Sequence, residues 1–182
     1  MPDRQTNRAY LSLGSNIEPE RNLPAAVREL RAFGRVLGVS SVWESAPFDA
    51  VGTAATDRAT RQETKNFLNA AVLLETELSP AELYDKAISV IERRLGRVRD
   101  PHDKNAPRTI DVDLSLFNHD VLEFAGRRVP DPDLLERPFV AIPLAQLDPD
   151  YLHPIEGRRL AEIAADLVAQ SGLRPRPDVR LE

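Results

Sequence analysis

The amino-acid sequence predicts an α+β fold in which an antiparallel or mixed β-sheet is covered by helices. Helix and strand patterns alternate along the chain, and no internal repeat is present. Residues 36–76, however, contain two strand patterns with no helical pattern between them. Because parallel neighbours need a long, usually helical crossover, this pair favours antiparallel pairing. We therefore expect a sandwich of the ferredoxin-like kind.

Length and composition set the class of protein. The chain of 182 residues is long enough for one domain with a substantial core and too short for two, so we expect a single domain over 1–182. Hydrophobic residues make up 42% of the chain, as in an ordinary globular protein. The net charge of −5 argues against a nucleic-acid partner, since such proteins are usually basic.

The cellular location is inferred from what the sequence lacks. There are no cysteines, which excludes disulfides and thiolate metal sites and favours a reducing cytoplasm. The first residues, MPDRQTNRAY, have no apolar leader, and no later stretch is long enough to cross a bilayer. We expect a cytoplasmic protein without a membrane partner, and a monomer.

The individual elements follow from the spacing of apolar residues. We expect strands at 9–14, 36–48, 67–76, 106–117 and 127–130, and helices through 23–33, 83–95 and 160–168. Gly34 is expected to stop the first helix and Gly96 the second. Ser79 should cap the second helix, with Glu82 three residues later completing a capping box.

Two connections are unusual. Residues 49–66 form a long polar stretch without an apolar period, which is typical of a lid or a disordered segment. Residues 96–107 join the second helix to the next strand. They contain the cations Arg97, Arg99 and Lys104, and Arg108 follows directly. A cationic loop therefore runs directly into the strand at 106–117.

That strand, APRTIDVDLSLF, carries two carboxylates inside an apolar run. Alternate side chains on a strand share a face. One face would carry four apolar residues: Ile110, Val112, Leu114 and Leu116. Asp111 and Asp113 would lie together on the other face, where they repel each other unless a cation lies between them.

The carboxylates and the cationic loop together indicate phosphate chemistry. Mg²⁺ prefers a few protein carboxylates and completes its octahedron with waters and phosphates. Arginines bind phosphates through charge-assisted, often bidentate hydrogen bonds. The combination predicts phosphoryl or nucleotidyl transfer from a nucleoside triphosphate, in which positioning and charge neutralisation supply most of the catalysis.

None of these signals is specific alone. A D-x-D pair often lies on a solvated strand edge, and loop arginines are often simply ion-paired. The glycine of LGSN at 13–16 is more often part of a plain turn, and the stretch does not have the Walker A spacing. Asn69 could satisfy a neighbouring backbone group, and Phe67 and Phe139 are residues that usually belong to a core.

The order of the motifs along the chain favours one family. YLSLGSN, SSVWESAPF, FLNAAVLLET, IERRLGRVR, APRTIDVDLSLF, VPDPDL and RPFVAIPLAQL follow each other in this sequence. The chain resembles the 6-hydroxymethyl-7,8-dihydropterin pyrophosphokinases, which move the β,γ-diphosphate of ATP onto a pterin alcohol in folate biosynthesis. The resemblance covers residues 9–155, the expected core of the domain, and leaves a helical C-terminal tail at 156–182.

The resemblance implies a role for each candidate residue. Asp111 and Asp113 would bind two Mg²⁺ ions, and Arg97, Arg99 and Arg108 would be catalytic along the triphosphate. The nucleotide would also be bound by Glu92, Lys104, Ile110 and Arg137. The pterin edge would meet Asn69 and Ser45 with the backbone from Ala46 to Phe48, while Phe67 and Phe139 would stack on its two faces.

Three positions depart from the family pattern. Lys104-Asn105-Ala106 stands where Arg-Trp-Gly is common, so the loop lacks a covering tryptophan and a bidentate fork. Asp131 replaces a histidine that would face the nucleotide, and Phe67 replaces a common tyrosine. These changes concern ATP affinity and loop closure more than the class of reaction.

Two other functions fit part of the pattern. A two-metal nucleotidyltransferase would also place paired aspartates on a strand, but it would release pyrophosphate rather than AMP. A ferredoxin-like binding domain without catalysis could show the altered residues at 104–106 and 131. The pterin-edge residues argue against the first alternative, and the retained carboxylates and arginines argue against the second.

Overall fold

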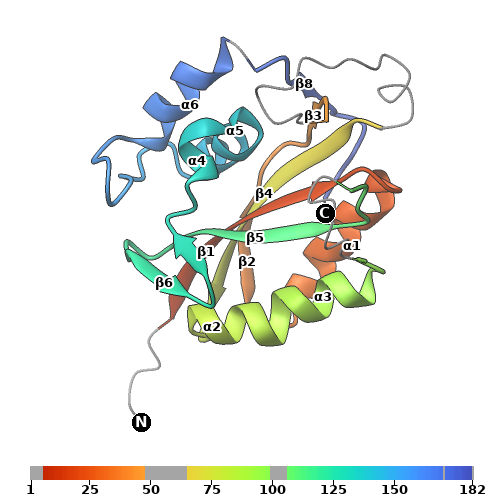
Figure 1. Cartoon of the computed structure of the whole chain (residues 1–182), viewed down its shortest axis with the longest axis horizontal. Coiled ribbons are helices and arrows are strands. Elements are labelled where there is room, and N and C mark those ends of the chain that lie inside the picture. Colours follow the sequence, from red (N-terminus) through yellow and green to blue (C-terminus); the bar gives the residue numbers. More distant parts are fainter. Residues whose placement is uncertain (1–5, 48–64, 99–105, 170, 182) are drawn as a thin grey trace.

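An antiparallel sheet forms the centre of the computed structural model, which describes residues 6–47, 65–98, 106–169 and 171–181 (Figure 1). Its strands are β1 (Asn7–Ser15), β2 (Arg35–Val39), β3 (Trp43–Ser45), β4 (Phe67–Thr76), β5 (Asp111–Phe117) and β8 (Arg174–Pro175). They are ordered β5-β1-β4-β3-β8, and β2 pairs with the other end of β4. The predicted antiparallel sheet is therefore confirmed, and all its registered pairs are antiparallel.

Helices cover both faces of this sheet. One layer contains α1 (Pro19–Leu30) and a continuous helix made of α2 (Pro80–Glu82), the π-helical turns η2 (Leu83–Ile88) and α3 (Ser89–Arg94). The other layer contains α4 (Asp133–Glu136), α5 (Pro138–Leu147) and α6 (Leu160–Val168). The order of β1, α1, β2–β3, β4, α2–α3 and β5 is that of a ferredoxin-like domain, as predicted.

Each layer has its own apolar core. The first includes Leu23 and Leu30 of α1 with Leu83 and Ile91 of the second helix, all fully buried. The second core includes residues of β1, β5 and the last three helices: Tyr10, Leu116, Leu134, Leu144 and Leu160. No helix in the described ranges is long and apolar enough to cross a membrane.

The strand predicted at 36–48 is broken into β2 and β3. Ser40 lies at the break, where its backbone N–H donates to the carbonyl of Ala71 at 2.9 Å. Its hydroxyl accepts the N–H of Ala71 at 2.8 Å. Because the serine side chain replaces a backbone partner there, the ladder is interrupted and the expectation of one continuous strand is wrong.

The strand that carries the aspartates is also irregular. It begins at Asp111 rather than at residue 106, and its register against β1 shifts where Tyr10 pairs with Leu116 but Leu11 pairs with Leu114. Ser115 is therefore the extra residue of a β-bulge. The bulge sends Leu116 to the second core, so the expectation that it shares a face with Ile110, Val112 and Leu114 is wrong.

The predicted start and end of the second helix are confirmed. The hydroxyl of Ser79 accepts the N–H of Glu82, and the Glu82 carboxylate accepts the N–H of Ser79 at 3.1 Å, which is a capping box. Gly96 follows the helix with φ 78°, a conformation that favours glycine. Between these ends, the η2 turns were not predicted.

A hairpin of β6 (Leu122–Phe124) and β7 (Arg127–Val129) follows β5 and forms a separate two-stranded sheet. Only the second of these strands was predicted. The C-terminal tail is helical over α6 and extended afterwards, with β8 added to β3 and Val179 buried in the first core.

Gly34 does not stop the first helix, which ends at Leu30. A Cβ on Gly34 would lie 2.2 Å from the carbonyl oxygen of Glu75, so the residue permits close approach of two backbones. We expect Gly34→Ala to lower the free energy of unfolding by about 3 kcal/mol, because neither backbone can move without disturbing the sheet.

Urea unfolding of both Gly34→Ala and a control, Gly38→Ala, checks this prediction. A Cβ on Gly38 would meet only the flexible Leu147 Cδ2, at 3.4 Å, so that variant should change the free energy of unfolding by less than about 1 kcal/mol. Equal unfolding midpoints and slopes for the two variants would contradict the role assigned to Gly34.

Candidate active site

The paired strands bring the candidate residues onto the face of the sheet that is covered by α4, α5 and α6. Gly14 of β1 lies opposite Asp111 on one side and opposite Asn69 of β4 on the other. Directly opposite residues of an antiparallel ladder point to the same face. Since Gly14 has no side chain, the sheet surface is bare between the carboxylate and the amide.

Two arginines bind Asp111. Arg97 Nη2 lies 3.1 Å from Asp111 Oδ1, and Arg108 Nη1 lies 2.5 Å from Oδ2. All three side chains are at least four-fifths buried, which strengthens the pairs relative to surface pairs. The cations expected near the aspartates are therefore present, and they come from the two ends of the predicted cationic loop.

Asp113 has a different environment. Arg127 Nη1 of the hairpin lies 3.8 Å from Asp113 Oδ1, a weaker pair than those of Asp111. Loss of solvation beside the surrounding residues, followed by repulsion from the carboxylates of Asp111 and Asp131, raises the pKa of the half-exposed Asp113 to about 7. The Arg127 guanidinium also lies over the Tyr84 ring, 3.8 Å from its centroid, and hydrogen-bonds the Tyr84 hydroxyl.

Glu92 of α3 binds the backbone of β5, the strand that carries the two aspartates. Its side chain is buried, with 4% exposed, and its Oε1 accepts the backbone N–H of Val112 at 3.1 Å. Val112 lies between the two aspartates on β5, which forms one edge of the sheet. Glu92 thus fixes the backbone that carries Asp111 and Asp113.

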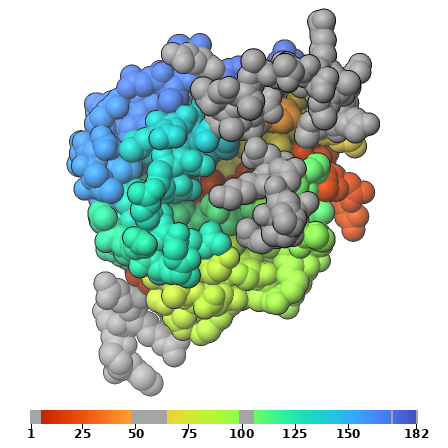
Figure 2. All heavy atoms as spheres, viewed as in Figure 1, coloured from red at the N-terminus to blue at the C-terminus, as the bar shows by residue number. Residues whose placement is uncertain are grey.

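A cavity of about 270 Å³ opens beside Asp113. It is lined by η2, β5, the hairpin and the start of the segment that leads into α4, with Tyr84, Arg127 and Asp131 among the lining residues. Figure 2 shows atoms of β1 and β5 at the bottom of a hollow between the second helix, in yellow-green, and the teal segment of β7 and α4. The hollow leads onto the sheet face that carries the aspartates.

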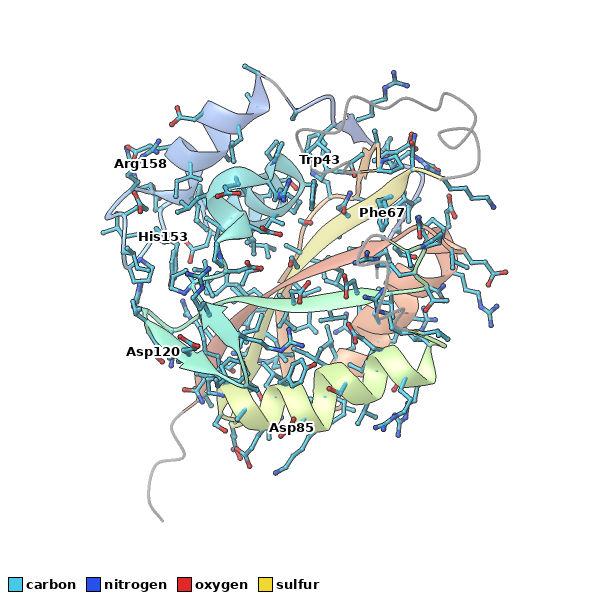
Figure 3. All side chains as sticks on the ribbon, viewed as in Figure 1. Trp43, Phe67, Asp85, Asp120, His153 and Arg158 are labelled. Carbon is cyan, nitrogen blue, oxygen red and sulfur yellow. The ribbon has the colours of Figure 1, made fainter. Side chains whose placement is uncertain are left out.

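On the other side of Asp111, the candidate pterin residues lie close together. Asn69 is buried and its amide donates to Ser45 Oγ at 2.9 Å. Phe67 is half-buried at the start of β4, and Figure 3 shows it at the same end of the sheet as Trp43. The Arg108 guanidinium lies 5.6 Å from the Phe67 ring centroid. Arg108 therefore contacts both the carboxylate and the aromatic residue.

The remaining candidates are more scattered. Phe139 is partly buried at the start of α5 and packs against the second core. Arg137 precedes it and lies 3.6 Å from Asp133. Ala46 is exposed after β3, while the Ile110 side chain is fully buried in the first core. Ile110 could thus contact a nucleotide only through its backbone.

Three candidates, Phe48, Arg99 and Lys104, lie outside the described residues. In contrast, Tyr84 and Arg127 lie beside Asp113 and were not among the candidates, while Asp131, expected only as the replacement of a nucleotide-facing histidine, lines the same cavity. Asp131 is held by its backbone N–H, which donates to the carbonyl of Ser115 at 2.9 Å, and burial raises the pKa of its carboxyl. No local pattern marks these contacts, because they arise from packing of the hairpin on η2 and β5.

The donor set can be tested for its fit to Mg²⁺. Among the residues that the structure describes, no group of three or more His, Cys, Asp or Glu side chains is arranged as a metal site. Mg²⁺ does not need such a cage, because one or two carboxylates suffice when waters and phosphates complete the octahedron. Asp113, crowded by like charges, is a carboxylate that a cation would stabilise. The residues fit Mg²⁺.

Paired carboxylates with arginines around them, beside a cavity, are typical of a transferase of phosphorus-containing groups. A model of the 7,8-dihydro-6-hydroxymethylpterin-pyrophosphokinase (HPPK) family matches residues 10–149. The chain belongs to this family. It is an ATP-dependent transferase whose reaction is pyrophosphoryl transfer to hydroxymethyldihydropterin in folate biosynthesis.

Curated relatives agree with the family match. The chain is 37% identical over 161 residues to the 2-amino-4-hydroxy-6-hydroxymethyldihydropteridine pyrophosphokinase of Pseudomonas aeruginosa, which covers 87% of this chain and 90% of the relative. It is 40% identical over 144 residues to the enzyme of the same name from Bacillus subtilis, covering 78% of each chain.

Solved structures agree in fold. Wild-type HPPK-DHPS of Plasmodium falciparum superposes with a TM-score of 0.66 at 14% identity and covers 93% of this chain. This chain spans 46% of that longer protein, so the likeness concerns one part of it. At this identity the comparison supports the fold.

Proposed function

We propose that this enzyme binds ATP with two Mg²⁺ ions along Asp111 and Asp113 and the reduced pterin against Asn69 and Ser45. In this arrangement the pterin hydroxyl attacks the β-phosphorus, the bond between the bridging oxygen and that phosphorus breaks, and AMP leaves. The proton of the hydroxyl passes to a solvent water in the same step. The bound ions would supply charge neutralisation of the phosphates and would lower the pKa of the attacking hydroxyl.

One observation carries the proposal: Arg108 contacts Asp111 with its guanidinium and lies over Phe67. The triphosphate of ATP beside Asp111 and the pterin ring beside Phe67 would therefore both lie next to Arg108. The Asn69 amide nitrogen donates to Ser45 Oγ at 2.9 Å and to the Trp43 carbonyl at 3.3 Å, so the Asn69 Oδ1 offers an acceptor and the Ser45 O–H a donor to the pterin edge. Phe67 and Phe139 would then cover the two ring faces.

The arginines would change partner during binding. Arg97 and Arg108 now neutralise Asp111. When Asp111 takes a metal ion, both guanidiniums become available to the triphosphate, where they would neutralise charge as the Pα–O–Pβ bridge breaks. The cavity beside Asp113, with Arg127 and Tyr84 on its wall, is the place we assign to the nucleoside of ATP.

A product analysis tests this function. Purified protein would be given ATP, Mg²⁺ and 6-hydroxymethyl-7,8-dihydropterin, and the nucleotide products would be separated. AMP that forms only with both pterin and metal supports diphosphate transfer. Release of pyrophosphate with an adenylylated acceptor would refute it in favour of nucleotidyl transfer. We further propose a cytoplasmic location. We also propose a monomeric state, and sedimentation of the protein would test that state.

A further inference from the structure

The end of the chain passes around the edge of the sheet close to the pterin side of the site. After α6, β8 pairs with β3 through Trp43↔Pro175 and Glu44↔Arg174. A few residues later, Val179 and Leu181 are buried in the first core, with α1. We call residues 174–181 the C-terminal strap. They run from β8, at one edge of the sheet, to the first core, which lies between the sheet and α1.

Arg176 is the residue at which the strap turns. Its Nη1 lies 2.9 Å from Glu44 of β3, and its Nη2 lies 3.2 Å from Glu20 of α1. The same guanidinium binds Asp178 within the strap, at 2.8 Å through Nη2 and at 2.9 Å through Nε. One arginine thus serves three carboxylates on three segments of the chain.

These contacts reach the residues that neighbour the candidate pterin residues along β3 and β4. The second oxygen of Glu44 accepts the amide N–H of Asn66 at 2.8 Å, and Asn66 is the residue before Phe67. The residue after Glu44 is Ser45, which accepts from Asn69. The carboxylate of Glu44 therefore joins Arg176 to the start of β4, next to Ser45 on one strand and next to Phe67 on the other.

The other arm of the network leads to the phosphate side. Glu20 belongs to the first turn of α1, which follows Asn16 on the chain. The side-chain oxygen of Asn16 accepts the backbone N–H of Arg108 at 2.7 Å. Glu20 and Asn16 are four residues apart on the chain, so Arg176 acts on Arg108 less directly than on the end of β3, which it reaches through Glu44.

A surface ion pair by itself has little effect, but this arrangement differs from an isolated pair. The planar guanidinium has five N–H donors in a fixed geometry, and its contacts use Nε and both terminal nitrogens. Without that cation, Glu20, Glu44 and Asp178 would face one another as three like charges. Their repulsion would separate β3 from α1 and move Ser45 relative to Asn69.

We propose that Arg176 is a positioning residue of the pterin site: by joining Glu44 to Glu20 it holds the end of β3, and with it Ser45 and the paired start of β4, in place against α1. This inference rests on the proposed assignment of the pterin to Ser45 and Asn69. It concerns the alignment of the pocket walls, since Arg176 itself lies beyond the residues proposed to touch the pterin.

Steady-state kinetics of the full-length variant Arg176→Met test this role. We expect the KM for the pterin to rise roughly tenfold, because small displacements of binding groups are costly, while the KM for ATP stays within about twofold. Arg176→Lys keeps the charge and should recover part of the pterin affinity. The control is Arg35→Met, which removes an arginine paired with Glu75 at 3.0 Å at the other end of β4 and should leave both constants unchanged.

The KM values of the variants for pterin and for ATP show whether Arg176 has this role. An unchanged KM for the pterin in folded Arg176→Met refutes the role of Arg176, and so does an equal rise of both constants, which would indicate general loosening. If Arg176→Met fails to fold, Glu44→Gln replaces it, with a rise of roughly threefold in the pterin KM expected and an unchanged value refuting the role. A wild-type protein without pterin-dependent AMP formation would refute the proposed function itself, and this inference with it.

Discussion

Replacing Asp113 with asparagine is expected to lower kcat about a thousandfold, because metal-assisted charge neutralisation is worth several kcal/mol in the transition state. The same change should leave the melting temperature equal or higher. The carboxylate of Asp113 is destabilised by partial loss of solvation and by the charges of Asp111 and Asp131, and a neutral amide of the same shape reduces both costs. Loss of activity without loss of stability is the signature of a functional carboxylate.

Product formation over time and thermal unfolding of the same preparation provide the two measurements. Asp85→Asn serves as the matched control, because Asp85 is exposed on the outer side of the second helix, as Figure 3 shows. It removes an equal charge at a distance from the site and should preserve turnover. If Asp113→Asn retained turnover within threefold of the wild type, the assignment of a metal to this residue would be wrong.

Replacing Arg108 with alanine should lower kcat/KM about a hundredfold, as expected for the loss of one preorganised charged donor. The change removes the guanidinium from Asp111 and from the Phe67 ring together. We expect the constants for both substrates to be affected, in contrast to the variants of Arg176. Arg108→Lys should recover only part of the activity, since an ammonium group keeps the charge without the fork.

Initial-rate measurements with either substrate varied would check this. Arg94→Ala removes an exposed arginine that pairs with Glu29 at 2.8 Å on the outer surface, and it should behave as the wild type. An Arg108→Ala enzyme whose pterin constants match those of the control would show that the arginine belongs to the phosphate side alone.

Features of the fold that depend on local spacing could be predicted from the sequence. The Asp pair and the buried residues of α1 follow from strand alternation and helical periodicity, and the cap at Ser79 follows from a four-residue pattern. In contrast, α5 was missed: Pro138 and Pro143 interrupt the helical pattern, and its apolar residues lie on all sides because the helix is largely buried.

Features that depend on a partner strand or a distant segment could not be predicted. The bulge at Ser115 exists only relative to the residues of β1 opposite it, so the reversal of Leu116 has no signal within the strand itself. Likewise, Arg127 meets Asp113 only because the hairpin folds back over η2. At the site, the residues on β5 were predicted from alternation, and those on the hairpin needed the structure.

The position of β5 at the edge of the sheet has a consequence for self-association. An edge strand exposes unpaired N–H and C=O groups that can join the sheet of another molecule and start aggregation. Here the N–H of Val112 is already bound by Glu92, and Asp113, whose paired Arg127 lies 3.8 Å away, would bring like charges together if two such edges met. The carboxylate proposed to bind a metal ion would therefore also keep concentrated copies of the protein apart.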